Sequence, residues 1–490
     1  MVMTSSGRSR YFILLALVLM SIPCAASGAG ADTDLELIPE ELQSGPAPEA
    51  GAQPPAAPSP YRIKVFLDEA LQGNFYRSSL AVPLPVSNFS GFTNRTSLDV
   101  RAEVTLFPTL SLTVADRLNY FAGPNMLESQ EGILNDLKET YLTWNMAGSY
   151  FIDLGRINVK NGVAIGFNPT DYFKKDAVTA IISQDATVLR ENRLGTLMMR
   201  TQGIWQMGSL TLVVAPEVPH EHDRWWTDES GGGLQLNRTN DRFRMLAKAD
   251  VNAIQDMNPE VLYFDDDGRS NVGLNLTRGL GDNVVVYAEW NVGQSPDMVS
   301  EALQNARNEG TIPSGLPPAI PGSSEIRFRN QLAAGFSYTE KNINRTTYFE
   351  YQYNEAGLSQ NEWNNWFAAG EAARGLLGNP ATSAVGKGIL GQLWAIREFA
   401  QEAQEPLSQH AIFIRSFWQD ALVKKLDLTG IFQINILDGS LYLQPLAEYH
   451  LSNALTVSLA FDFYLGAKGS DFGSLPQWGD IRAGFRYYFY

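Results

Sequence analysis

The chain is dominated by runs in which apolar and polar residues alternate. In the run 95–106, for example, Leu98 and Val100 alternate with Asp99 and Arg101. Successive side chains of a strand point to opposite faces, so each run predicts a strand with one apolar and one polar face. The expected strands are 61–70, 95–106, 111–119, 137–145, 149–157, 193–205, 209–217, 241–251, 258–265, 270–278, 283–292, 326–338, 345–354, 409–419, 424–436, 440–449, 455–465 and 479–489.

The spacers between these runs alternate between a short set and a long set. The short set comprises 107–110, 146–148, 206–208, 252–257, 279–282, 339–344, 420–423 and 450–454. The other set comprises 71–94, 120–136, 158–192, 218–240, 293–325, 355–408 and 466–478, with two short turns at 266–269 and 437–439. Transmembrane barrels place short turns on the periplasmic rim and long loops on the outer rim. The sequence therefore predicts an all-β fold, a single transmembrane antiparallel β-barrel of about 18 strands, with about 16 as the alternative count.

The start of the chain predicts export. Arg8 and the apolar run after it, followed by an A-x-A pattern of small residues, are typical of a signal peptide over 1–31. Residues 32–60 are acidic and then rich in proline and alanine, which predicts a periplasmic linker. The barrel then occupies 61–490, and the expected location is the cell outer membrane.

Composition excludes two classes of partner and chemistry. The net charge of −16 at pH 7 argues against nucleic acid, because no basic surface would attract phosphates. The only cysteine, Cys24, falls in the expected signal peptide, so the mature chain has no disulfide or thiol chemistry.

The chain ends in GDIRAGFRYYFY. Ile481, Phe485 and Phe489 share one face of the expected last strand, and Arg482 and Arg486 share the other. This ending resembles the last strand of Gram-negative outer-membrane barrels, which finishes on an aromatic residue. The resemblance implies handling by the β-barrel assembly machinery, with outer-membrane lipid and lipopolysaccharide as surroundings.

A second resemblance is carried by the segment GRINVKNGVAIGFNPTDYFKK. It resembles a segment of large porin-like outer-membrane families that include relatives of the alginate exporters, in which a strand end with glycine and a basic residue leads into a loop with N-P-x-D. The matching positions are Gly155, Arg156, Asn168, Pro169 and Asp171. The resemblance implies a channel fold, and it raises export of an acidic polysaccharide as one possible task.

Charged residues on the polar faces of the expected strands are the candidate pore lining. The basic set is Arg101, Arg117, Arg242, Arg244, Lys248, Arg329, Lys425, Arg482 and Arg486. The acidic set is Asp99, Glu103, Asp250, Glu289, Glu350, Asp427, Glu448 and Asp462. Such charges either pair across strands and brace the barrel or form separated ladders that select charged solutes.

The loop 158–192 is the candidate constriction. A barrel of about 18 strands is wide enough for an aqueous channel, so something must narrow it. The loop combines basic residues, an Asn-Pro turn and an apolar run that has to pack on something. Its candidate residues are Arg156, Lys160, Asn168, Pro169, Asp171, Lys174, Lys175, Arg190 and Arg193. The alternative is an ordinary external loop.

The loop 355–408 carries two helical patterns, the first opened by a capping box of Ser359 and Glu362. We expect these helices to cap the mouth, as simple packing elements, as a gate or as a partner-binding surface. The pair His220 and His222 lacks a third metal ligand, and no serine elbow points to His410 or His450. We therefore expect no enzyme activity, no metal and no cofactor.

Together these patterns predict an outer-membrane channel for passive passage of small polar or charged solutes. The alternatives are an exporter of an acidic polysaccharide and a structural or adhesion barrel that acts through its surface loops.

Overall fold

The computed structural model of the chain describes residues 60–79, 89–124, 132–179, 186–219, 226–227, 233–252 and 257–489. The expected signal peptide, the expected linker up to residue 59, the histidine pair in 220–222 and Tyr490 lie outside the described residues.

The described chain forms one closed sheet of 18 strands, so the predicted fold class is confirmed. Each strand pairs with its sequence neighbours in antiparallel register, and β1 pairs with both β2 and β18, which closes the ring. The strands are β1 (Tyr61–Tyr76), β2 (Phe92–Phe107), β3 (Leu110–Ala122), β4 (Gly132–Met146), β5 (Tyr150–Ile157), β6 (Thr196–Trp205), β7 (Gly208–Ala215), β8 (Arg244–Val251), β9 (Glu260–Asp266), β10 (Arg269–Leu280), β11 (Val284–Ser295), β12 (Arg327–Glu340), β13 (Arg345–Asn354), β14 (His410–Trp418), β15 (Leu426–Asn435), β16 (Leu441–His450), β17 (Leu455–Leu465) and β18 (Gln477–Phe489).

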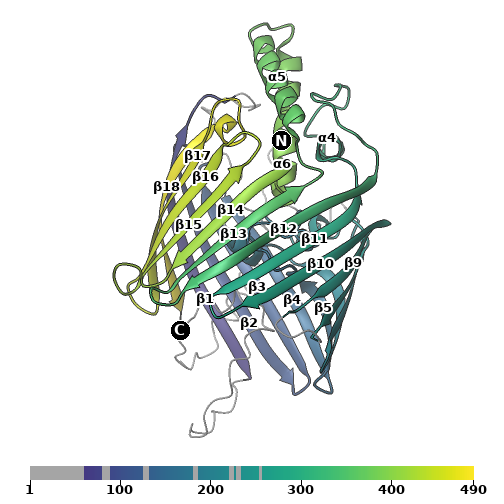
Figure 1. The fold of residues 1–490 in the computed structure, drawn as a ribbon, viewed down its shortest axis with the longest axis vertical. Helices are drawn as coiled ribbons and strands as arrows, with labels where there is room; N and C mark the ends of the chain where they lie inside the picture. Colours follow the sequence, from purple (N-terminus) through teal and green to yellow (C-terminus); the bar gives the residue numbers. More distant parts are fainter. Residues whose placement is uncertain are drawn as a thin grey trace, which may run out of the picture.

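The two kinds of connection sort to the two rims of the barrel, as predicted. Figure 1 shows short turns at the lower rim, where β18 ends, and the helices α4 (Met298–Asn308), α5 (Gln360–Leu377) and α6 (Ser383–Glu402) at the opposite end. The turn between β9 and β10 is an exception on the long-loop rim. It consists of Asp267 and Gly268, with φ of 53° and 83°. Two successive positive φ values are the geometry of a tight hairpin turn that suits Asp-Gly.

The two faces of the wall differ in chemistry. On β3, Arg117 and Asn119 are buried, whereas Leu118 and Tyr120, which alternate with them, are exposed. The last strand behaves in the same way, with Phe489 exposed next to Val65 of β1. Apolar side chains therefore cover the outer surface, and the polar set lies on the inner face, as a barrel in lipid requires.

Helices lie in the long connections. They are α2 (Ala186–Glu191), α3 (Leu236–Thr239), α4 (Met298–Asn308), α5 (Gln360–Leu377), α6 (Ser383–Glu402) and the 3-10 turn η4 (Phe472–Ser474). The predicted capping box is present at Ser359 and Glu362, and the α5–α6 hairpin rises above the rim in Figure 1. Trp363 and Trp366 are buried against α4 and α6. In the described residues, none of these helices combines the length and the apolar character of a membrane span.

Two of the pore-lining candidates that were expected on strands lie outside the strands. Lys425 was expected on the polar face of 424–436, but β15 begins at Leu426, and Lys425 occupies the preceding turn with φ of 69°. It is exposed at the short-turn rim and does not line the wall. Arg242 precedes β8, which begins at Arg244.

Candidate functional site: an inward loop on a polar wall

The segment 158–179, which follows β5, runs across the inside of the barrel. Its residues contact Glu289 of β11 and Glu350 of β13, six and eight strands farther round the ring. Both glutamates share the inner face of their strands with buried residues. The segment therefore lies within the lumen side of the wall and not over its outer surface.

Glu289 holds the first part of this segment through backbone groups. Its Oε2 accepts hydrogen bonds from the backbone nitrogens of Val163 (2.9 Å) and Ala164 (3.1 Å). Its Oε1 accepts from the backbone nitrogen of Thr170 (2.8 Å) and from the Thr170 hydroxyl (2.9 Å). Glu289 is 0% exposed, and no cation lies within 4 Å of it among the described residues. Amide donors thus stabilise a buried carboxylate.

Glu350 holds the next three residues in the same manner. Its Oε2 accepts from the backbone nitrogens of Ile165 (2.9 Å) and Gly166 (3.2 Å), and its Oε1 accepts from that of Phe167 (2.9 Å). The Tyr287 hydroxyl donates to Oε2 at 3.1 Å, and the side-chain amide of Gln352 donates to Oε1 at 2.8 Å. Five consecutive backbone amides, 163–167, are therefore bound by two carboxylates of the wall.

Glycine at position 162 permits this close approach. Gly162 has φ of 94°, and a Cβ atom built there would lie 2.6 Å from both carboxylate oxygens of Glu289. A larger residue would meet steric conflict and an unfavourable backbone conformation at once.

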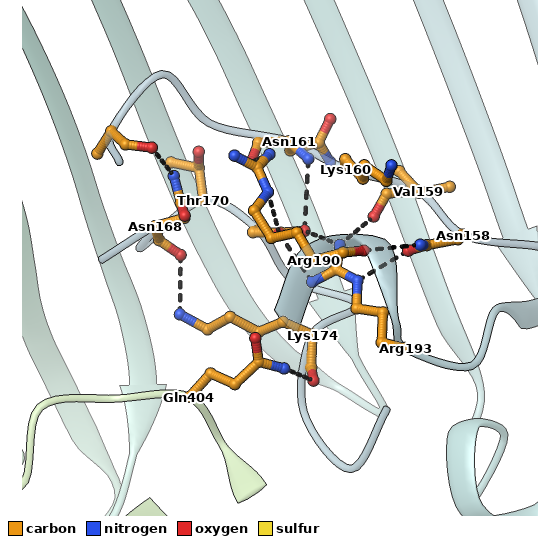
Figure 2. A network of polar contacts seen from close by, with 12 residues as sticks. Asn158, Val159, Lys160, Asn161, Asn168, Thr170, Lys174, Arg190, Arg193 and Gln404 are labelled. Carbon is orange, nitrogen blue, oxygen red and sulfur yellow. Dashed lines mark hydrogen bonds and ion pairs between the residues drawn. The ribbon is translucent and has the colours of Figure 1, made fainter. Parts of the chain in front are cut away.

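A buried ion pair braces the other side of the segment. Oδ2 of Asp171 lies 2.9 Å from Nη1 of Arg193. Oδ1 of Asp171 accepts a hydrogen bond from Nη2 of the same arginine at 3.1 Å. Figure 2 shows Arg193 and Arg190 reaching the segment from the return of the loop towards β6, with Arg193 also bound to Asn158 and Val159. Burial alone would raise the pKa of Asp171, but Arg193 and Arg190 bring it below its ordinary value of 3.8.

Two lysines connect the segment to the helical region above it, Lys174 to the residue Gln404 after α6 and Lys175 to α4. Lys174 donates to the backbone oxygen of Asn168 at 2.8 Å, and its own carbonyl accepts from Gln404, as Figure 2 shows. Lys175 pairs with Glu301 of α4 at 3.1 Å. Burial lowers the pKa of Lys174, whereas for Lys175 the pairing with Glu301 outweighs burial and raises it.

The structure corrects part of the predicted constriction lining. Arg156 (3% exposed), Lys174 (7%) and Arg193 (0%) were expected to face water, but they are buried. Arg156 donates to the carbonyl oxygens of Gly195 and Leu234. The physical reason is that loop carbonyls and Asp171 need donors once the loop is folded inward. Of the remaining candidates, Asn168, Pro169 and Asp171 are also buried, whereas Lys160, Lys175 and Arg190 are partly exposed.

On the wall formed by β18, β1, β2 and β3, carboxylates contact cations. Asp68 lies 3.1 Å from Arg95 and 2.9 Å from Arg486, and Asp99 lies 3.0 Å from Arg117. Lys138 of β4 also contacts Asp99, at 2.5 Å. Side chains of this wall remain accessible at Arg101 and Glu103, where 39% and 41% are exposed, and at Arg486 with 37%.

The other candidate wall residues also form pairs. Arg244 and Arg242 contact Asp266 and Asp241, Lys248 contacts Asp250 and Glu260, Arg482 contacts Asp462, and Asp427 contacts His450. Glu448 of β16 lies opposite Asp427 of β15. Arg329 is buried at the long-loop rim and has no carboxylate within 4 Å among the described residues. Cross-strand pairing is therefore the dominant state of these charges.

Sequence reasoning missed several members of the site. Arg95, Asp68 and Lys138 belong to the paired wall but were not singled out. The alternation of 95–106 already placed position 95 in phase with Asp99, so the signal for Arg95 was present. For Asp68 the signal was weak, because β1 carries the apolar Phe66 on its inner face and the charged Glu69 on its outer face.

Comparisons with known proteins give a fold-level likeness only. No family model and no curated protein matches the chain. OccAB1 of Acinetobacter baumannii is similar in structure, with 9% identity, a TM-score of 0.49, and 88% of this chain and 96% of that chain covered. OccK11 (OpdR) of Pseudomonas aeruginosa has 10% identity and a TM-score of 0.47, with 87% and 95% covered.

A triple variant of Rhodopseudomonas blastica porin has 8% identity and a TM-score of 0.39, with 88% and 100% covered. At these values the likeness carries no argument about function, and the barrel assignment depends on the strand pairing itself. The resemblance to alginate exporters has no support among these comparisons.

Proposed function

We propose that the protein is an outer-membrane channel for passive passage of small polar or charged solutes, narrowed by segment 158–179. The observation that carries the proposal is the contrast between the two faces of a closed 18-stranded ring. Apolar residues such as Leu118 and Tyr120 are exposed outside, and accessible charges such as Arg101 and Arg486 stand inside. Barrels of this strand number leave an aqueous channel.

Segment 158–179 is the proposed constriction. Its path from β5 to β13 crosses the lumen side, where two buried glutamates accept its backbone amides and the pair of Asp171 with Arg193 braces its other side. The channel selects by size at the segment and weakly by charge along the wall, because most wall charges are paired.

No observation favours the other two tasks over this one. Export of an acidic polysaccharide drew on basic residues at the constriction, and Arg156, Lys174 and Arg193 are buried. A structural barrel would use the α5–α6 hairpin, but its Trp363 and Trp366 are buried in the core that the hairpin forms with α4.

Planar-bilayer recording of the purified full chain tests the proposal. We expect stable ionic current with discrete steps after insertion. A barrel that inserts, shown by resistance of its strands to protease, but carries no current would contradict the channel and favour the structural task.

A further inference from the structure

A polar pocket opens at the long-loop rim, where β11 ends, β12 begins and helices α4 and α5 start. Its volume is about 320 Å³, and its wall includes Asp297, Arg327, Arg329, Glu355, Ser359 and Glu362. None of its lining residues belongs to segment 158–179. A cavity of this size lies at the small end of the range for ligand pockets.

Arg329 is the unusual member of this pocket. It points inward from β12 opposite Gly293, and it is 4% exposed. Its Nε donates a long hydrogen bond of 3.3 Å to the Ser295 carbonyl, and no carboxylate of the described chain lies within 4 Å. A guanidinium has five N–H donors in a fork that fits a carboxylate. The terminal nitrogens of Arg329 are therefore donors that the fold leaves available in the pocket.

The carboxylates of the pocket are partly engaged by the protein. Asp297 caps α4 and accepts from the backbone nitrogens of Ser300 (2.7 Å) and Ser323, one on each oxygen. Both oxygens of Asp297 are therefore already engaged by the protein.

Glu355 and Glu362 each use a single oxygen. Oε2 of Glu355 accepts from the backbone and side-chain nitrogens of Asn330, both at 2.9 Å. Oε2 of Glu362 accepts from the backbone nitrogen of Ser359 at 2.8 Å. In the described chain, Oε1 of Glu362 accepts no hydrogen bond, and Oε1 of Glu355 has only Arg327 at 4.0 Å.

The charge balance decides the ligand class. Three carboxylates and two guanidiniums line the pocket, so a simple anion that reaches Arg329 meets an excess of negative charge. A simple cation would leave the Arg329 guanidinium buried and unpaired, which is costly. A ligand that carries both charges satisfies both ends.

We propose that this pocket binds a small zwitterion of the amino-acid type, with its carboxylate on Arg329 and its ammonium group on Oε1 of Glu355 and Glu362. Binding at the rim goes beyond the channel function and does not depend on it, because it is measurable without conduction.

Isothermal titration of the purified full chain with three probes of three carbon atoms each tests the proposal. β-Alanine carries both charges, propionate only the negative one and propylammonium only the positive one. We expect β-alanine to bind and the other two to bind at least tenfold more weakly. Equal binding of propionate would overturn the zwitterion assignment, and absence of β-alanine binding would overturn the site.

Two variants locate the binding. Arg329→Gln removes the guanidinium, and we expect at least a tenfold loss of β-alanine affinity. Glu362→Gln preserves the capping box, since glutamine can make the same return contact, but it removes the charge. It should weaken the binding of β-alanine and strengthen that of propionate, because one negative charge beside the anion is gone. Arg345→Gln, at the short-turn rim, is the matched control and should bind as the unaltered chain does.

The strand content of each variant and the change in its gel mobility on heating report whether the variant folds. If Arg329→Gln fails to fold, Arg329→Lys keeps the charge but loses the fork, and it should still weaken β-alanine. Unchanged affinity in folded Arg329 variants would overturn the site. Bilayer current from the same preparation separates this result from the channel proposal, because each can fail while the other holds.

Discussion

The two sides of the inner wall use buried carboxylates in two different ways. On β11 and β13, Glu289 and Glu350 accept backbone amides of segment 158–179 and contact no cation within 4 Å among the described residues. On β1 and β2, Asp68 and Asp99 contact arginines and a lysine. The position of the inward segment accounts for the difference, because its backbone amides reach the wall at β11 and β13, whereas cations of neighbouring strands reach the carboxylates of β1 and β2.

This contrast shows that an inward-facing charge has no fixed role in a barrel. Where chain covers the wall, a carboxylate becomes an anchor for backbone groups. Where cations of neighbouring strands reach them, buried carboxylates such as Asp68 and Asp99 pair across strands and brace the sheet. The predictions below test this division, beginning with the anchors.

Removal of both anchors should have the largest effect. Glu289→Ala with Glu350→Ala leaves the amides of 163–167 without acceptors, at about 1–3 kcal/mol for each buried group left unpaired. We expect the segment to leave its place and single-channel conductance to rise roughly twofold or more, because a barrel of this size is open without it. Glu103→Ala is the control, since Glu103 is half-exposed and contacts Arg101, and it should change conductance little. Equal conductance of the double variant and the unaltered chain would show that the segment is not held by these carboxylates.

Loss of the buried ion pair should loosen the same segment from its other side. Arg193→Met leaves the buried Asp171 with only Arg190, 3.7 Å away, as a cationic partner, and breaking a buried pair costs about 3–5 kcal/mol. Hydrogen exchange of the amides 161–171 should accelerate accordingly. Lys160→Met removes an exposed contact with Glu191. It should change the free energy of opening, measured by hydrogen exchange, by about 1 kcal/mol or less. Similar effects of the two changes would mean that Arg193 is not the buried brace.

Acid should weaken the brace in a defined pH range. The folded pKa of Asp171 lies below 3.8, so its pair with Arg193 contributes full stability above that value. The contribution is lost as pH falls through the lower, folded pKa, because the proton neutralises the carboxylate. Exchange of the amides 161–171 should therefore accelerate only below pH 3.8. Asp171→Asn should abolish this dependence, and a transition that persists in the variant would assign it to another group.

A change on the exposed wall should have the smallest effect. Arg486→Gln removes a partly exposed partner of Asp68, which keeps its contact with Arg95. Because only one charge of the wall changes and most of the others stay paired, the cation-to-anion permeability ratio should change by less than about twofold. Reversal potentials in a salt gradient measure this ratio, with Arg345→Gln as the control at the rim. A complete reversal of selectivity would show that this wall, and not the inward segment, governs passage.

Much of the barrel could be predicted from the sequence, because a strand reports its faces through alternation with a period of two. Connection length then gave the rim of each turn. Strand ends were less accurate, since β1 continues to Tyr76 and β2 begins at Phe92, beyond the regular alternation. Helix α4 was not predicted, whereas the capping box marked the start of α5.

The roles of individual charges could not be predicted in this way. Glu289 was recognised as a wall residue, but its partners are backbone amides that lie more than a hundred positions earlier in the chain. Arg193 looks like a water-facing loop residue until Asp171 is brought to it by folding. Burial of a charge depends on tertiary partners, and a local pattern contains no information about them.

The most direct test of the account is the size limit of the pore for neutral polymers, measured in planar bilayers with the unaltered chain and with Glu289→Ala/Glu350→Ala. We predict that polymers of intermediate radius are excluded by the unaltered chain and enter the double variant. The same limit in both proteins would contradict an inward segment held by the two wall carboxylates.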